Sequence, residues 1–243
     1  KLQRARGVRD LLPKEAIPRQ AILDKLRKNF ELYGFSPAET PILERYETLA
    51  SKYAGGAEIL KETFRLKDQG NRDLGLRYDL TVPLCRLVGM NPQIKMPFKR
   101  YQIGPVFRDG PVNLGRYREF YQCDVDIIGS KSMLADAELL SLASSVFKDL
   151  KLKVNLNVNN VKLLNSILEY ANIKENKDSV LLTLDKLDKI GLEAVKSELK
   201  QKNVPESSIK KLLEVINLKG NNEAKIKKLK TTLNNGMLKI KIN

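Results

Sequence analysis

One stretch of the chain, FRDGPVNLGRYREFYQCDVD at residues 107–126, holds three arginines, three aspartates and a glutamate between apolar residues that a folded protein would bury. Arginine carries a rigid fork of N–H donors that suits phosphate or carboxylate groups. Aspartates that face such a fork can hold an ammonium group, and the ring of Phe120 can stack on a base. These residue types predict that one face of the strands in this stretch is a binding pocket.

Alternation along three extended segments places the charges on one face. Successive side chains of a strand point to opposite faces, and residues 116–127, 98–108 and 74–80 all alternate between apolar and polar positions. Each segment therefore has an apolar back and a polar front. The front positions are Arg77, Asp79, Arg100, Gln102, Arg108, Arg116, Arg118, Phe120, Gln122, Asp124 and Asp126.

An antiparallel sheet with one face in water is the ordinary alternative to a pocket. A solvated face usually carries Lys, Glu and Thr, whereas the front of residues 116–127 has no lysine and is rich in Arg, Asp and Gln. This composition favours the pocket. The loop between Asp109 and Gly115 joins two basic strand ends, a position suited to closing over a phosphate.

The elements that must position these residues indicate an α+β unit. Apolar residues at helical spacing predict a helix that ends at Gly34, and Pro83 near the first turn of TVPLCRLVGM predicts a short helix there. The segment ETFRLKDQGNRDLGLRYDL predicts a hairpin that turns near residues 69–71. Further expected elements are an extended segment at 36–44, a helix at 45–53 and a helix at 131–150.

The composition changes near residue 150. All 14 arginines lie at or before Arg118, and 19 lysines follow from Lys151 onward. We therefore expect two units, residues 1–150 and 151–243, the second lysine-rich and mostly helical. Its expected elements are a strand at 152–159, helices near 162–170, 180–190, 192–202 and 209–215, and a strand at 236–243. That last strand stops in mid-pattern, so we expect a chain that continues.

The overall composition of the chain narrows the classes of protein to which it can belong. A net charge of +15 suggests a polyanionic partner such as nucleic acid, although AT-rich codon usage that favours lysine explains it nearly as well, because the lysines are dispersed. No apolar run has membrane-spanning length, and the basic N-terminus lacks the apolar core of a secretory signal. Cys85 and Cys123 are isolated, which indicates reduced, buried thiols in a cytoplasmic protein. The absence of histidine removes the commonest general base and zinc ligand, and no metal site is expected.

Four motifs together resemble the catalytic domain of the histidyl-tRNA synthetases, which are class II aminoacyl-tRNA synthetases. They are RGVRDLLP, LRYDLTVPLCR, YQIGPVFRDGPVNLGRYREFYQCDVDIIG and ADAEL. The resemblance covers roughly residues 4–145, and the second unit is similar to the helical insertion of that family only loosely. It implies an α+β fold in which an antiparallel sheet is flanked by helices.

The resemblance also implies a reaction. Histidine attacks the α-phosphate of ATP to give histidyl-adenylate and pyrophosphate, and the histidyl group then passes to its tRNA. This chemistry depends on positioning and charge neutralisation more than on a protein base, and Mg²⁺ would bridge the phosphates. The implied partners are histidine, ATP, tRNA and a second copy of the chain, met through the segment around Pro41. For the lysines from Lys151 onward a solvated helical surface is favoured over a contact with tRNA.

Residue by residue, the resemblance assigns the amino-acid pocket first. Asp79 and Thr81, in LRYDLT, correspond to the positions that hold the amino group of the substrate. Gln122 and Asp126 would line the same pocket, with Asp126 facing the imidazole.

The ATP site follows from the same motifs. Arg108 would contact the α-phosphate and the substrate carboxylate, Arg116 would hold ATP phosphate from across the loop, and Phe120 would stack on adenine. The family often has a glutamate two positions after this arginine, where the present sequence has Gly110 beside Asp109. The residue that would bind the adenine amine is therefore left open.

Two other functions compete with a histidine–tRNA ligase. One is the synthetase-like regulatory subunit of ATP phosphoribosyltransferase, which senses histidine without charging tRNA, and the other is an inactive fragment or interaction module. Retention of Arg108, Arg116 and Phe120 together with a basic surface favours the ligase. The family's Arg-Gly-Tyr histidine-binding segment, third class II motif and anticodon-binding domain are expected after residue 243, so we expect a partial chain that can be inactive alone.

Overall fold

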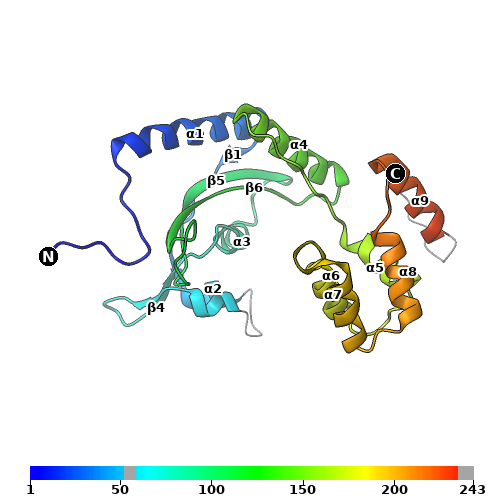
Figure 1. Ribbon diagram of the computed structural model, residues 1–243. Coiled ribbons are helices and arrows are strands. Elements are labelled where there is room, and N and C mark those ends of the chain that lie inside the picture. Colours follow the sequence, from blue (N-terminus) through cyan, green and yellow to red (C-terminus); the bar gives the residue numbers. More distant parts are fainter. Residues whose placement is uncertain (52–57, 235–243) are drawn as a thin grey trace. The chain divides into compact units, whose positions relative to one another are not determined.

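A computed structural model describes residues 1–51 and 58–234 of the 243-residue chain (Figure 1). The chain divides into two compact units, Lys1–Leu156 and Asn157–Asn243. This division falls after Leu156, whereas the composition of the sequence changes at residue 150.

Two small sheets organise the first unit. In one, the long strands β5 and β6 run antiparallel over ten residue pairs, from Phe98 opposite Ile128 to Phe107 opposite Glu119, and β1 pairs with β5 in parallel. In the other, the order is β2-β4-β3 and both pairs are antiparallel. The strands are β1 (Ser36–Pro37), β2 (Leu43–Arg45), β3 (Arg65–Lys67), β4 (Asp73–Leu76), β5 (Phe98–Phe107) and β6 (Glu119–Ile128).

Helices cover both sides of the β5–β6 ribbon. Helices α1 (Pro13–Leu32) and α4 (Met133–Asp149) lie along one side, and α3 (Thr81–Met90) lies on the other (Figure 1). The apolar back predicted for these strands is confirmed, since Tyr101, Ile103, Cys123, Val125 and Ile127 pack with residues of α1 and α4. Short elements complete the unit, namely α2 (Tyr46–Ser51) and the 3₁₀ helix η1 (Glu58–Glu62).

Local signals explain where these helices begin. Pro13 occupies the first turn of α1, where its missing N–H costs nothing. Ser132 caps α4, because its hydroxyl oxygen accepts a hydrogen bond from the Leu134 N–H at 3.2 Å. The Asp79 carboxylate does the same for α3 through the Val82 N–H at 2.9 Å. The α+β class inferred from the sequence is confirmed.

The second unit is helical throughout its described part. Its helices are α5 (Val161–Tyr170), α6 (Lys177–Leu184), α7 (Leu187–Gln201), α8 (Glu206–Ile216) and α9 (Asn222–Asn234). Leu168, Val180, Val195, Leu199 and Leu212 are fully buried in its core. Gly191 breaks α7 with a left-handed φ of 79°, a conformation open to glycine. The kink separates the two helical patterns that the sequence places on either side of this residue.

One predicted element is wrong. Residues 152–159 alternate like a strand, yet the described chain there has no regular structure, and the apolar members Leu152, Val154, Leu156 and Val158 are exposed. Alternation makes a strand only when a neighbouring edge supplies hydrogen bonds. Helix α9 was not predicted, because lysines interrupt its few apolar positions. The strand expected at 236–243 lies outside the described residues.

Candidate active site

The register between β5 and β6 places polar side chains of the predicted front face next to one another. The pairs that lie opposite one another are Arg100 and Asp126, Gln102 and Asp124, Gly104 and Gln122, and Val106 and Phe120. Opposite side chains on one face of an antiparallel pair lie about 5 Å apart at Cβ. Two acids, an arginine, two amides and an aromatic ring therefore share one side of the ribbon.

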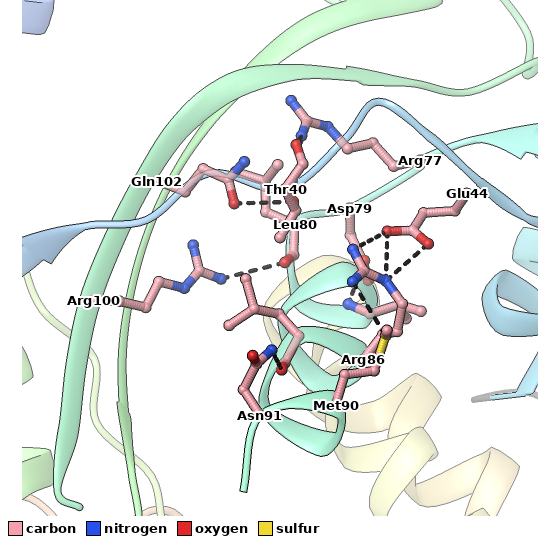
Figure 2. Close-up of polar contacts among 12 residues, drawn as sticks. Thr40, Glu44, Arg77, Asp79, Leu80, Arg86, Met90, Asn91, Arg100 and Gln102 are labelled. Carbon is pink, nitrogen blue, oxygen red and sulfur yellow. Dashed lines mark hydrogen bonds and ion pairs between the residues drawn. The ribbon is translucent and has the colours of Figure 1, made fainter. Parts of the chain in front are cut away.

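Arg100 forms the deepest charged contact of this face. Its side chain is 1% exposed, and its Nη2 lies 2.8 Å from Asp126 Oδ2. The same Nη2 donates a hydrogen bond to the Leu80 carbonyl at 3.3 Å (Figure 2). Burial lowers the pKa of Arg100 and raises the pKa of Asp126, while each charge favours the charged state of the other. The pair therefore links β6 to the start of α3.

Asp124 lies two residues earlier on β6 and on the same face. Burial raises the pKa of Asp124, the negative charges of Asp126 and Asp79 add to that effect, and Arg100 opposes it. Nearby, Gln122 has a buried Oε1 with no hydrogen-bond partner within the part of the chain that the structure describes. Unpaired polar groups on an otherwise packed strand face are typical of a site that a ligand completes.

Two residues of the polar front, Arg77 and Gln102, form hydrogen bonds within the protein. Arg77 is 3% exposed and donates hydrogen bonds from Nε to the Pro105 carbonyl at 2.9 Å and from Nη1 to the Thr40 carbonyl at 2.6 Å. Gln102 contacts Thr40 Oγ1 at 3.2 Å (Figure 2). Arg77 fits because Gly104 has no side chain: a Cβ there would lie 2.6 Å from Arg77 Nη2.

Asp79 and Thr81 flank Leu80 at the start of α3. Asp79 is 9% exposed and caps the helix, as described above. Thr81 is partly buried and lines a pocket of about 670 Å³ together with Cys85 and Arg86 of α3 and with residues of α2. The prediction that both thiols are buried is wrong for Cys85, which is exposed at this pocket, while Cys123 is partly buried. Of the predicted amino-acid-binding residues, Asp126 is thus tied through Arg100 to the peptide between Asp79 and Thr81.

The loop after β5 encloses a second, smaller pocket. It measures about 250 Å³ and is lined by Arg108, Gly110, Pro111, Gly115, Arg116, Tyr117 and Phe120. The Arg108 guanidinium carbon lies 5.1 Å from the centre of the Phe120 ring, and Arg108 Nε donates a hydrogen bond to the Tyr78 carbonyl at 3.2 Å. The three residues expected to bind ATP therefore share one pocket.

Glu62 is a residue of this pocket region that sequence reasoning missed. Its Oε1 lies 3.1 Å from Arg116 Nη2, and its carbonyl accepts a hydrogen bond from the Asp109 N–H at 2.7 Å. A Cβ at Gly110 would lie 2.8 Å from Glu62 Oε1. A carboxylate therefore stands beside position 110, supplied from 48 positions earlier in the chain, and no local pattern around Glu62 signals it.

The N-terminal segment braces the same loop. The Gly7 carbonyl accepts a hydrogen bond from the Arg118 N–H at 2.8 Å, and the Arg9 guanidinium carbon lies 4.7 Å from the centre of the Tyr117 ring. Gly7 has a φ of +85°, and a Cβ there would lie 2.8 Å from both Arg118 and Val112. Glycine is required at this close approach, which the sequence alone did not reveal.

Neither a metal cluster nor a spanning helix is found within residues 1–51 and 58–234. No three His, Cys, Asp or Glu side chains of these residues are arranged to hold an ion. None of their helices is long and apolar enough to cross a membrane. Pro41 is exposed next to Ile42 and Leu43, which are 38% and 49% exposed.

Comparison with known proteins places this geometry in a family. The family model of histidyl-tRNA synthetase matches residues 7–240. The histidine–tRNA ligase 1 of Bacillus cereus is 50% identical over 206 residues, which are 84% of this chain and 47% of that protein. The chain thus spans about half the length of the curated relatives it matches.

Comparison with solved structures points to the same family. The crystal structure of histidyl-tRNA synthetase from Nostoc sp. PCC 7120 superposes with a TM-score of 0.80 at 30% identity, covering 96% of this chain and 53% of that one. A structure from Bacillus halodurans, described as an ATP phosphoribosyltransferase regulatory subunit/histidyl-tRNA synthetase, gives 0.78 at 25% identity over 95% of this chain and 59% of that one. The chain belongs to the histidyl-tRNA synthetase family.

Proposed function

We propose that the protein carrying this chain is a histidine–tRNA ligase that activates histidine with ATP and transfers it to tRNA. The observation that carries the proposal is the loop pocket, in which Arg108 and Arg116 lie with the Phe120 ring. Two arginines beside an aromatic ring suit a triphosphate attached to a base. A protein that only senses histidine has no need of this set.

Arg108 is the residue proposed to act on the reacting atoms. Its Nε is held by the Tyr78 carbonyl, so the guanidinium is fixed before substrate arrives. The terminal N–H groups are then available to the α-phosphate and to the histidine carboxylate, which react with each other. A fixed donor fork at developing negative charge lowers the barrier, because no reorganisation is required during the reaction.

Arg116 and Phe120 would hold the remainder of ATP. Arg116 is half exposed on the far side of the loop and pairs with Glu62, which limits its positions without burying it. It would take phosphate oxygens, and Phe120 would stack on adenine. Mg²⁺ that accompanies ATP would supply charge neutralisation at the phosphates, beside Arg108 and Arg116.

The amino acid would occupy the space at the start of α3 and on β6. Asp79 and Thr81 are proposed to hold its amino group, and Gln122 and Asp126 to line the pocket for its side chain. The peptide that joins Asp79 to Thr81 is tied to Asp126 through Arg100, which supports a single shared pocket. We further propose a cytoplasmic homodimer that meets its partner through the exposed segment around Pro41.

The test is amino-acid-dependent exchange of pyrophosphate into ATP by the product of the complete reading frame, with histidine compared against the other amino acids. We expect exchange with histidine alone. Arg108→Ala should reduce it about 10²–10³-fold, whereas Lys210→Ala, on an exposed face of the second unit, should leave it unchanged. Histidine binding without exchange would favour the regulatory-subunit alternative, and neither binding nor exchange would favour an inactive module.

A further inference from the structure

The loop pocket, whose lining includes Arg108, Arg116 and Phe120, has a carboxylate at its edge. Gly110 lines this pocket, and a Cβ at that position would lie 2.8 Å from Glu62 Oε1. The Glu62 carboxylate therefore occupies the space into which a side chain at position 110 would point. Phosphate binding alone does not explain an acidic group at this place.

Two sets of contacts fix this carboxylate. The Glu62 carbonyl accepts a hydrogen bond from the Asp109 N–H at 2.7 Å, which attaches η1 to the loop. The Glu62 carboxylate accepts hydrogen bonds from Arg116 Nη2, at 3.1 Å to Oε1 and 3.4 Å to Oε2. Its side chain is 22% exposed, so it is held at the pocket and does not extend into solvent. A carboxylate has about four acceptor sites, and Arg116 leaves some of them open to a ligand.

The two acids that flank the loop are differently placed. Asp109 forms an ion pair with Arg118, with 2.9 Å between Oδ1 and Nη2. Glu119 directly precedes Phe120 on β6, so the two side chains point to opposite faces of the strand. Glu62 is therefore the carboxylate of this region that is best placed to serve a ligand in the pocket.

The ligand proposed for this pocket is a nucleotide whose base stacks on Phe120. Stacking does not distinguish one base from another, because every base has a π-face. Hydrogen bonds to the edge of the base must supply that distinction. Adenine carries an exocyclic amine, which donates hydrogen bonds, where guanine and hypoxanthine carry an oxygen that only accepts them. An ionised carboxylate offers acceptors alone, so Glu62 suits the amine and repels the oxygen.

We propose that Glu62 selects adenine in the loop pocket, because its carboxylate, beside Gly110, accepts a hydrogen bond from the exocyclic amine of ATP. Gly110 is required for this arrangement, since a side chain there would take the place of the carboxylate. Arg116 balances the negative charge of Glu62 next to the triphosphate. This inference rests on the proposed function and deepens it, because it names the group that recognises the base.

Analogues that differ from ATP only at C6 of the purine test this role in the product of the complete reading frame. ITP has an oxygen at C6, and purine riboside triphosphate has only hydrogen there. For the unaltered protein, we expect kcat/KM in histidine-dependent pyrophosphate exchange to be about ten- to hundredfold lower with either analogue than with ATP. Equal values for ATP and purine riboside triphosphate would overturn the inference without the use of any variant.

Glu62→Gln tests the residue itself, because it keeps the size of the side chain and adds an amide NH₂ group that can donate to an oxygen. We expect this variant to lose about tenfold in kcat/KM with ATP and to gain with ITP, so that most of the discrimination disappears. Glu15→Gln, the same change at an exposed position of α1, is the matched control. It should leave the ratio of kcat/KM for ATP to that for ITP unchanged.

Other outcomes for Glu62→Gln would contradict the inference while the ligase stands. An equal loss with ATP and with ITP would show that Glu62 only holds Arg116. A lower KM for ATP would show that Glu62 competes with phosphate for Arg116.

The proposed function can fail separately from the inference. If the unaltered protein exchanges no pyrophosphate with histidine, the ligase fails, and calorimetry with ATP and with ITP then decides the role of Glu62. Tighter binding of ATP than of ITP, with the difference lost in Glu62→Gln, would support the inference. Equal Kd values for the two nucleotides, or binding of neither, would overturn it.

Discussion

Arg100 and Glu198 are both centres of charge, one in each unit, and their surroundings differ. Arg100 lies on a packed strand face, 1% exposed, with Asp126 as its ion-pair partner. Its Nε and Nη1 have no hydrogen-bond partner among the residues that the structure describes. Glu198 lies on the rim of a helical core, where it accepts hydrogen bonds from Lys186 at 2.8 Å and from Thr183 at 3.0 Å, with Lys202 also 3.0 Å away.

The pKa shifts run in opposite directions for a physical reason. In the first unit burial dominates, and it raises the pKa of Asp124 and Asp126. In the second unit the hydrogen bonds from Lys186 and Lys202 dominate, and they lower the pKa of Glu198 to about 2. A carboxylate whose charge is opposed by burial is typical of a binding site, whereas one stabilised by hydrogen bonds from lysines is typical of a structural ion-pair network.

The largest expected effect tests whether the second unit is a scaffold with its own core. Leu212 is fully buried in α8, and Leu212→Ala should lower the free energy of unfolding of this unit by about 2–5 kcal/mol. Hydrogen exchange should show the loss in α5–α9 while β5 and β6 keep their protection. Leu182→Ala is the control, because Leu182 is 63% exposed. Equal loss of protection in β5 and β6 would show that the two units share one cooperative core.

A smaller effect is expected at the loop pocket. Gly110→Ala would place a Cβ 2.8 Å from Glu62 Oε1. The Glu62 carboxylate, at the end of a flexible side chain, should then turn away from Arg116. Because Arg116 loses the contact that limits its positions, we expect the KM for ATP to rise roughly tenfold. Steady-state exchange kinetics at varied ATP measure this change. Gly89→Ala in α3 is the matched control, since nothing lies within 4 Å of its Cβ position. An unchanged KM would mean that Glu62 does not hold Arg116 in the active state.

The smallest effect is a contrast in pH dependence. The pKa of Glu198 is lowered from 4.5 to about 2, so its contribution to stability is present above pH 4.5 and is lost as the pH falls toward 2. Asp124 and Asp126 have raised pKa values, so their contribution is present below their unfolded value of 3.8 and is lost as the pH rises through the folded values. Acid should therefore lower the stability of the second unit, whereas protonation of Asp124 and Asp126 should favour the folded state of the first unit.

Hydrogen exchange at pH 3 and pH 6 measures this contrast, helix by helix. Glu198→Gln should remove the acid sensitivity of α6 and α7 and leave that of β6 as it was. Equal loss of protection in β6 and α7 at pH 3 would contradict the opposite pH dependence expected for the two units.

Side-chain alternation was enough to predict the front and the back of the strands, because period two is a local property of the chain. It could not predict that Arg100 lies opposite Asp126 and that Gln102 lies opposite Asp124, since parity assigns a face and not a register. Gly7 and Glu62 reach the loop pocket only through the tertiary fold. The roles that the family resemblance gives to individual residues stay predictions.

The prediction of a strand at 152–159 is wrong because alternation says nothing about hydrogen-bonded neighbours. Alternation of Leu152, Val154, Leu156 and Val158 describes which side chains would share a face, but a strand also needs a hydrogen-bonded neighbour. The described chain supplies none at this place. Sequence patterns thus predicted β6 correctly, where β5 lies alongside, and mispredicted a segment of similar pattern that stands alone.

Gly104 has a consequence for how this sequence can change over evolutionary time. The guanidinium of Arg77 occupies the space that a methyl group at position 104 would need, and its hydrogen bonds to the carbonyls of Pro105 and Thr40 leave it little freedom to withdraw. The two positions are therefore epistatic. An alanine at position 104 should be tolerated only in a chain that already has a smaller residue at position 77. The substitution at 77 must therefore come first, and the reverse order passes through a destabilised protein.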